Sequence, residues 1–294
     1  MLTRQLPLFD VDAPRSMPKP FLKWAGGKSQ LLGQFAAHYP RRFRRYCEPF
    51  VGSAAVYWHL YALRAAGELV FGDVCLMDSN VELINCYRVV RDDVSELLAQ
   101  LANHRKRHKK QYYYSVRAQR VDALSPIERA ARFIYLNKTC FNGLYRVNRA
   151  GQFNVPMGSY RNPRIFDAEE LRAASLALQG VDLEVRDFRE VLHWAKEGDF
   201  VYFDPPYAPV SRTANFTSYT EKAFGEAEQR ELAAVLHKLH RRGCQVMLSN
   251  SWIDATLKLY AAFNQHEVKA ARVINSKADR RGKVSELLVT NYPI

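Results

Sequence analysis

The 294-residue sequence lacks the features that mark membrane, secreted and metal-binding proteins. It has no run of about 18 apolar residues, so no membrane-spanning helix is expected. Its N-terminus carries prolines and acidic residues without an apolar core, unlike a signal peptide. The five cysteines are scattered and form no C-x-x-C pair, which argues against a zinc ribbon or a disulfide framework. No His, Cys and carboxylate cluster has metal-ligand spacing, so we predict no metal ion and a reducing, cytoplasmic location.

The charge balance is the unusual part of the composition. Lys and Arg number 43 against 30 acidic residues, giving a net charge of +13 and a pI near 9.6. Such an excess favours a polyanionic partner such as nucleic acid, because each phosphate that is neutralised releases condensed counterions. A ribosome-associated or simply basic protein is the alternative. Hydrophobic residues make up 48% of the chain, which is enough for a large core.

Strands and helices alternate in both the first and the last part of the chain. An early strand is followed by a glycine-bearing turn, a helix and a second strand that ends on Asp78. This order is typical of a nucleotide-binding parallel sheet. The predicted helices are 29–39, 54–66, 226–241 and 255–263. The predicted strands are 45–48, 69–77, 199–203, 245–248, 268–274 and 286–291.

The middle of the chain has a different character. It is helical at first, then rich in Asn, Gly, Arg and aromatic residues, and it contains a basic tract at 104–110 followed by three tyrosines. We therefore predict an α/β fold in which a basic insertion, residues 91–171, interrupts a parallel sheet. Residues 18–90 and 172–294 would form the sheet domain, and residues 1–17 a loose leader.

The strongest motif is Asp204-Pro205-Pro206-Tyr207, which follows the apolar strand at 199–203. Ligands of open α/β sheets bind beyond the carboxyl ends of the strands. The prolines stiffen the turn, so nearby carbonyls point outward as acceptors. A carboxylate, rigid carbonyls and an aromatic face suit a planar amine. Asp204 and the Pro205 carbonyl would accept the N–H groups of adenine N6 while Tyr207 stacks on the base. The alternative is a structural turn with an aspartate cap.

Several blocks, in order, resemble the DNA adenine methyltransferases of the Dam and DpnM type, which recognise GATC. The blocks are 21–28 (FLKWAGGK), 48–52 (EPFVG), 82–87 (ELINCY), 141–146 (FNGLYR), 153–156 (FNVP), 202–207 (YFDPPY), 214–219 (ANFTSY) and 248–250 (LSN). The resemblance implies a Rossmann-like, S-adenosylmethionine-dependent methyltransferase sheet with an inserted DNA-recognition domain, mainly helical plus a hairpin. It further implies methyl transfer to N6 of an adenine flipped out of duplex DNA.

The same resemblance assigns cofactor-binding residues. They are Trp24, Lys28, Glu48, Pro49, Phe50, Gly52, Asp78 and Asp204. Lys28 would meet the cofactor carboxylate, and Gly52 would let the turn pass close to the ligand. Asp78 would hold the ribose, although Asp73 is a rival and Asp78 could instead cap a helix. A phosphate-binding loop is excluded because Leu22 stands where that motif needs glycine.

The resemblance also assigns DNA-binding residues. They are Lys23, Phe141, Asn142, Leu144, Arg146 and Pro156. Arg146 can donate hydrogen bonds to both acceptors of a guanine edge. Asn142 has the donor and acceptor pair that can bind adenine or contact the backbone. Phe141 would wedge into the base stack, while Leu144 and Pro156 could meet a thymine methyl group. The alternatives are core packing for Phe141 and Leu144 and a solvated side chain for Lys23. The tract 104–110 could grip phosphates or form a solvated helix face, as could Lys277, Arg280, Arg281 and Lys283.

Three other functions fit parts of the pattern. RNA and protein-glutamine methyltransferases usually carry Asn, and N4-cytosine enzymes Ser, in the place of Asp204. A catalytically inactive DNA-binding relative would lack some of the pocket residues that are present here. The expected partners are double-stranded DNA and, by resemblance, a restriction endonuclease of the same site, in a bacterial or phage setting. The strand before Asp78 is predicted to be longer than in close family members. The oligomeric state does not follow from the sequence.

Overall fold

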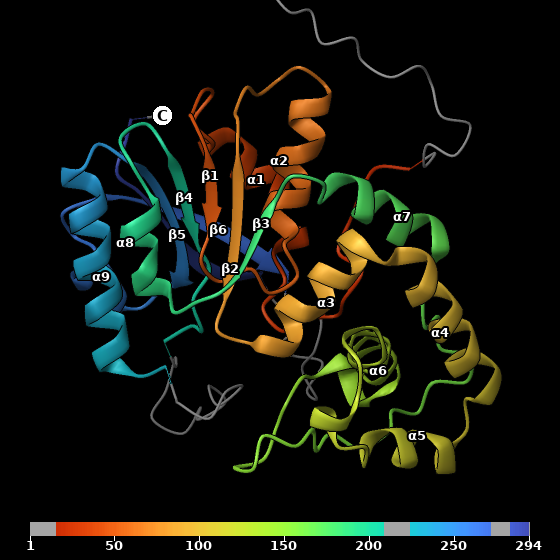
Figure 1. Cartoon of the computed structure of the whole chain (residues 1–294). Helices are drawn as coiled ribbons and strands as arrows, with labels where there is room; N and C mark the ends of the chain where they lie inside the picture. The colour runs from red at the N-terminus through yellow and green to blue at the C-terminus, as the bar shows by residue number, and fades with distance from the viewer. Residues whose placement is uncertain (1–15, 209–223, 272–282, 294) are drawn as a thin grey trace, which may run out of the picture.

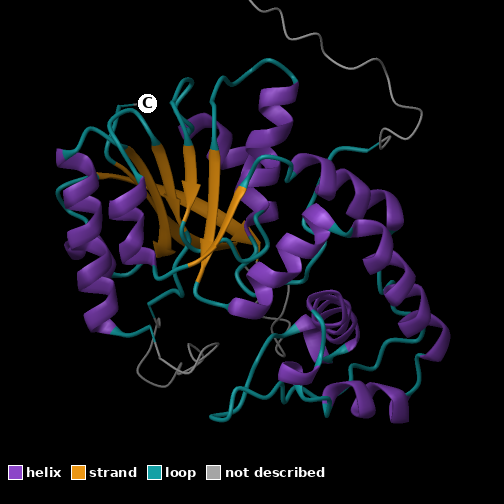
Figure 2. Cartoon of the chain, viewed as in Figure 1, coloured by secondary structure: helices purple, strands orange, loops and turns teal. Residues whose placement is uncertain are grey.

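A seven-stranded mixed sheet forms the centre of the molecule (Figures 1 and 2). The computed structural model describes residues 16–208, 224–271 and 283–293. The strands are β1 (Tyr46–Glu48), β2 (Val74–Asp78), β3 (Asp182–Val185), β4 (Phe200–Phe203), β5 (Gln245–Ser251), β6 (Asn264–Ala271) and β7 (Lys283–Thr290). Their order is β3-β2-β1-β4-β5-β7-β6. The first five are parallel, and β7 is antiparallel to both β5 and β6. The predicted Rossmann-like α/β sheet is therefore confirmed.

Helices cover both faces of this sheet. They are α1 (Leu32–Phe35), α2 (Ala55–Ala65), α3 (Val81–Asp92), α4 (Val94–Arg107), α5 (Lys110–Arg117), α6 (Pro126–Thr139), α7 (Ala168–Ala177), α8 (Val191–Trp194), α9 (Glu226–Arg241) and α10 (Asp254–Leu259). Because strand side chains alternate between faces, Tyr202 joins a core with α2 and α3, while its neighbour Phe203 joins a core with α8 and α9. No helix among the described residues is long and apolar enough to cross a membrane.

Three element predictions need correction. The strand predicted at 69–77 begins only at Val74; before it, the segment makes an isolated bridge at Val70, and the Gly72 N–H donates to the Arg44 carbonyl at 2.7 Å. The strand that ends on Asp78 has five residues. The helix predicted at 29–39 is broken into short 3₁₀ and α turns, and the helix-weakening Gly33 lies within it. Strand β3 was not predicted, since its four residues carry only one fully buried apolar side chain.

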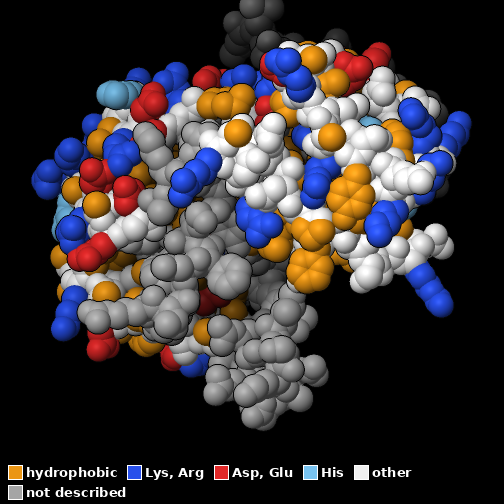
Figure 3. All heavy atoms as spheres, turned by 90° about the horizontal axis from the view of Figure 1, so that it is seen from below, with side chains coloured by type: hydrophobic (Ala, Val, Ile, Leu, Met, Phe, Trp, Pro, Cys, Tyr) orange, Lys and Arg blue, Asp and Glu red, His pale blue; other side chains and the backbone are white. Residues whose placement is uncertain are grey.

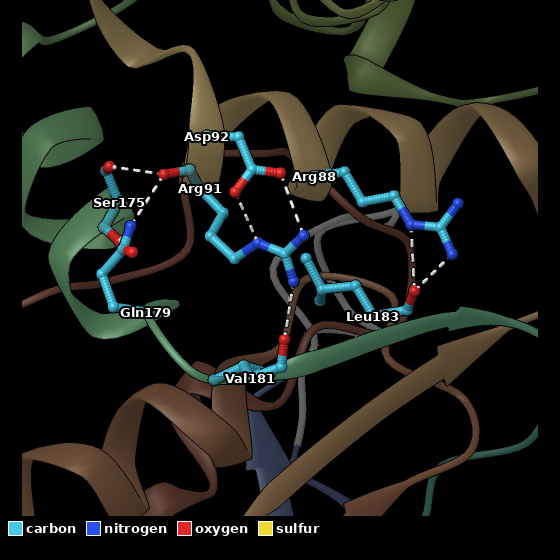
Figure 4. Close-up of polar contacts among 7 residues, drawn as sticks. All are labelled: Arg88, Arg91, Asp92, Ser175, Gln179, Val181 and Leu183. Carbon is cyan, nitrogen blue, oxygen red and sulfur yellow. Dashed lines mark hydrogen bonds and ion pairs between the residues drawn. The ribbon is translucent and has the colours of Figure 1, made fainter.

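Arginines of α3 cover the outer edge of β3 (Figure 4). Arg88 donates to the Leu183 carbonyl through two guanidinium nitrogens, and Arg91 donates to the Val181 carbonyl at 2.7 Å. Ser175 of α7 in turn donates to the Arg91 carbonyl at 3.2 Å. Uncovered edge strands are sites for pairing with other chains. These contacts satisfy the edge and fix the first helix after Asp78 to the sheet.

The insertion is built around α6, which packs on α3 and α4 (Figure 1). Ser125 and Glu128 form a capping box at its start, and Pro126 occupies its first turn. Near its end, the buried Asn137 amide accepts from the Lys23 N–H at 2.8 Å and donates to the Lys23 carbonyl at 2.7 Å. The same amide donates to the Gly143 carbonyl at 3.1 Å. Asn137 therefore joins the N-terminal segment, α6 and the loop at 141–146.

Candidate active site and DNA-facing loop

A large cleft of about 1320 Å³ lies at the carboxyl ends of β1, β2 and β4. It is lined chiefly by residues 24–28, 48–53, 78–82, 186–189 and 204–208. All the cofactor-binding and catalytic residues predicted from the sequence line it. The Asp-Pro-Pro-Tyr turn and the region near Phe50 therefore share one open cavity, and the turn is not packed inside the core.

The turn between β1 and α2 requires glycine at its closest approach to Trp24. Gly52 has a φ of +46°, and a Cβ placed there would lie 2.8 Å from the Trp24 ring. The Gly52 N–H donates to Asp78 Oδ2 at 3.3 Å, and its carbonyl accepts from the Tyr87 hydroxyl at 2.9 Å. Both backbone groups are thus fixed, and the absence of a side chain lets the Trp24 ring pack directly against this turn.

Asp78 lies inside the cleft, whereas Asp73 does not. Asp73 precedes β2, is exposed, and lines a different cavity. The Asp78 carboxylate accepts from the Gly52 N–H and from the Asn80 N–H at 2.9 Å. The helix cap is Asn80, whose side chain accepts from the Glu82 and Leu83 N–H groups. Burial raises the pKa of Asp78 to about 6, although the backbone N–H groups oppose this shift.

The floor and one wall of the cleft combine a buried acid with aromatic rings. Glu48 is buried and accepts from the Tyr46 hydroxyl at 2.9 Å, and burial raises its pKa well above the usual range. Phe50 stacks on Phe188 with 5.4 Å between ring centroids, and Phe224 meets Phe50 edge-on. Phe188 was not predicted as a site residue. It follows the unpredicted strand β3, so no sequence pattern brought it to the cleft.

The Asp-Pro-Pro-Tyr turn carries an ion pair with the buried Lys28. The Lys28 ammonium lies 2.8 Å from Asp204 Oδ1 and 4.6 Å from the centroid of the Tyr207 ring, and it also donates to the Gly26 carbonyl. Among the described residues, Asp204 Oδ1 is buried and has no partner besides this ion pair. Burial raises the pKa of Asp204 to about 6, and Lys28 opposes that shift.

A hydrogen-bonded layer behind the turn fixes its backbone. Gln229 of α9 donates to the Pro206 carbonyl at 3.1 Å and accepts from the buried Asn250 amide at 2.9 Å. Asn250 also accepts from the Ala208 N–H at 3.2 Å, and the Ser251 hydroxyl donates to the Ala208 carbonyl at 2.7 Å. Asn250 belongs to a block that resembles the family, but Gln229 was missed. A buried polar residue on the apolar face of a helix was the available signal.

The predicted DNA-binding residues lie apart from this buried site, on and beside an exposed loop. Phe141 is 50% exposed, which excludes core packing, and Asn142 adopts a left-handed conformation with φ of 54°. Leu144 is half-buried against the core. Arg146 is exposed, and its Nε donates to Asn154 Oδ1 at 2.7 Å.

Two further predicted residues flank that loop. Pro156 is exposed, and its carbonyl accepts from the Phe141 N–H at 2.9 Å. The Lys23 ammonium lies 4.1 Å from the centroid of the Tyr160 ring, so this side chain is packed on an aromatic face rather than freely solvated. The Tyr113 hydroxyl of α5 supports the loop from behind by donating to the Val155 carbonyl at 2.9 Å.

The basic tract spans the last turn of α4, residues 108–109 and the start of α5, and its lysines and arginines are exposed. Among the described residues, its lysines and arginines make no ion pair: Arg105, Lys106, Arg107, Lys109 and Lys110. Two of them lie over aromatic rings. Seen from below, Lys and Arg side chains are spread over the side of the insertion (Figure 3). Lys277, Arg280, Arg281 and the block 214–219 lie outside the described residues, as does the Lys283 side chain.

Comparison with known proteins identifies the class of enzyme. The model of the family "D12 class N6 adenine-specific DNA methyltransferase" matches residues 24–274. The chain belongs to this family and is an adenine-specific DNA methyltransferase. The resemblance to Dam-type enzymes is thereby confirmed, and family membership implies S-adenosylmethionine as the methyl donor.

Named relatives match over nearly the whole chain. The Type II methyltransferase M.MjaIII of Methanocaldococcus jannaschii is 43% identical over 291 residues, covering 93% of this chain and 99% of that protein. The Type II methyltransferase M1.LlaDCHI of Lactococcus lactis subsp. cremoris is 41% identical, with coverage of 93% and 95%. The DNA adenine methylase of Haemophilus influenzae is 33% identical, with coverage of 94% for both chains.

Proposed function

We propose that this enzyme methylates N6 of an adenine flipped out of duplex DNA, within the sequence GATC. The observation that carries the proposal is the acceptor geometry of the Asp-Pro-Pro-Tyr turn. Beyond its ion pair with Lys28, the Asp204 carboxylate accepts no hydrogen bond from the described residues, and none ends on the Pro205 carbonyl. Two acceptors at a rigid turn match the two N–H groups of adenine N6. Accepting both would draw the nitrogen towards tetrahedral geometry and favour positive charge there.

The cleft fits S-adenosylmethionine beside that turn. The bound cofactor would supply an electrophilic methyl group on a sulfonium. Gly52 lets the turn lie directly against the Trp24 ring, and Asp78 offers a half-buried carboxylate at the end of β2, suited to ribose hydroxyls. Phe50 and Phe188 form an apolar wall against which the adenine ring of the cofactor could pack. The Lys28 ammonium already forms an ion pair with Asp204. If it also contacted the cofactor carboxylate, one positive charge would pair with two carboxylates.

The exposed loop would read the DNA. In this proposal residues 18–90 and 172–294 are catalytic, and residues 91–171 recognise the target. Arg146 would bond a guanine edge and Asn142 an adenine or the backbone, because both side chains are exposed. Flipping the adenine out of the DNA costs a few kcal/mol of base unstacking. Phe141 would then fill the gap that the adenine leaves in the base stack. A restriction endonuclease acting on the same site stays a prediction.

Radiolabelled methyl transfer tests this function directly. Duplexes with one GATC site, and matched duplexes in which GATC is replaced by GTAC, are incubated with the enzyme and labelled cofactor. We expect labelled N6-methyladenine in the first only. Equal labelling of both duplexes would overturn GATC as the target. Label in N4-methylcytosine would overturn the assignment of the acceptor.

A further inference from the structure

The side chain of Tyr207 is held by an acidic residue from the far end of the chain. Its hydroxyl donates to Glu286 Oε2 at 2.6 Å. Glu286 lies on β7, where it is in register with Ser251 of β5 and Val268 of β6. It also lines the cleft. A carboxylate from the strand that runs antiparallel to both of its neighbours therefore reaches the turn that carries Asp204.

The Tyr207 ring is fixed at two points. The Lys28 ammonium lies 4.6 Å from the ring centroid, and Lys28 is only 4% exposed, so it is held over the ring by its own burial. Glu286 fixes the opposite end of the ring through the hydroxyl. A planar partner can then stack only on the ring face that Lys28 leaves open.

We propose that Glu286 is a positioning residue of the methylation site, which orients Tyr207 for stacking on the target adenine. This inference rests on the function proposed above. The negative charge of Glu286 also acts on Asp204, the proposed acceptor. It repels the ionised form of Asp204 and so contributes to the raised pKa of that carboxyl. Lys28 opposes this effect. A residue that served only the stability of β7 would influence neither the ring nor the titration of Asp204.

A double-mutant cycle isolates the contact between the two side chains. Single-turnover methylation of a GATC duplex is measured for Glu286→Ala, Tyr207→Phe and the double variant at saturating cofactor. Each single change should slow transfer about 10- to 100-fold, the loss expected for a hydrogen bond to a charged group. The double variant should be no slower than either single one, because each removes the same interaction. Independent, multiplicative losses would overturn the proposal.

Conservative variants and pH separate positioning from stability. Glu286→Gln keeps an oxygen acceptor for the hydroxyl, so it should restore most of the rate that Glu286→Ala loses. The rate requires ionised Asp204, so it should rise with pH through about 6 in the unaltered enzyme. Removing the Glu286 charge lowers the pKa of Asp204, so the acid limb of the Glu286→Gln profile should move to lower pH. If the acid limb of the pH–rate profile does not move in Glu286→Gln, the charge of Glu286 does not raise the pKa of Asp204 as proposed.

Two controls complete the design. Glu267→Gln removes a carboxylate on neighbouring β6 that pairs with Lys269 and Ser285, and it should leave the rate and the profile unchanged. Tyr207→Ala tests the stacking role itself, and normal transfer by this variant would overturn that part of the proposed function. Slow transfer by Tyr207→Ala, together with normal rates for Glu286→Ala and Tyr207→Phe, would overturn only the inference about Glu286.

Discussion

The cleft and the DNA-facing loop present their functional side chains in opposite ways. In the cleft, Lys28, Gly52 and Asp78 are each fixed by protein contacts, and the backbone of the turn is held by buried amides. On the loop, Phe141 is half exposed, and Arg146 has one partner among the described residues, the nearby Asn154. The side chains of the cleft are thus preorganised by the protein, while those predicted to read DNA keep donors that protein contacts do not use.

The largest effect should follow from removing the acceptor in the cleft. Asp204→Ala should slow methyl transfer by at least about 10²- to 10³-fold, because its carboxylate is the acceptor that the rigid turn aims at the N–H. Cofactor binding, measured by calorimetry, should persist. Asp73→Ala, which removes an exposed aspartate outside the cleft, is the matched control and should be neutral. Near-normal turnover of Asp204→Ala would refute the proposed role.

A smaller and more selective effect is expected on the loop. Arg146→Ala should cost about 1–3 kcal/mol of discrimination at one guanine of the target. The measurement compares kcat/KM on GATC with that on duplexes altered at each position. Arg149→Ala, at an exposed arginine of the same hairpin, should leave this preference intact. An equal loss of kcat/KM on all duplexes would instead indicate that Arg146 contacts a phosphate. Arg146 and Arg149 would then not differ in their effect on sequence preference.

The close approach of Gly52 to Trp24 can be tested by stability. Gly52→Ala should lower the free energy of unfolding by about 1–2 kcal/mol for the left-handed backbone alone, with a further loss from the contact with the ring. It should also weaken cofactor binding. Gly33→Ala adds the same methyl group where no neighbour lies within 4 Å, and it should be neutral or slightly stabilising. Equal melting temperatures for both variants would contradict the tight fit.

The smallest effect concerns the basic tract at 104–110. Replacing Lys106, Lys109 and Lys110 with Gln should flatten the slope of log K against log salt by about 0.9 for each phosphate that is no longer neutralised. Affinity should fall equally for GATC and for other duplexes. The same change at the exposed Lys238 and Lys258, on α9 and α10, should leave the slope unaltered. An unchanged slope in the tract variant would make the tract a solvated helix face.

Sequence patterns predicted which residues line the cleft better than they predicted the residues that hold the cleft's turns in place. The Asp-Pro-Pro-Tyr turn and the turn at 48–52 each end a strand, so their place at one edge of the sheet followed from topology. Asp78 was preferred to Asp73 on the family pattern, and the fold places only Asp78 in the cleft.

The supporting residues escaped prediction because they arrive from distant segments. Gln229 and Glu286 reach the catalytic turn from α9 and β7, and no local periodicity links either of them to residues 204–207. Phe188 follows a strand too short and too exposed for its pattern to be recognised. The pairing of Lys28 with Asp204 was likewise not foreseen, because ion pairs between distant residues leave no trace in spacing.

Asn137 has a mechanical consequence for how the two regions communicate. One buried amide group holds the backbone of Lys23, directly before Trp24, and also the carbonyl of Gly143 in the reading loop. A shift of this loop would therefore either carry the wall of the cleft with it or break buried hydrogen bonds, each worth about 1–3 kcal/mol. If the loop binds DNA and the cleft binds the cofactor, as proposed, each ligand should change the affinity for the other, and thermodynamic reciprocity requires the coupling to be equal in both directions.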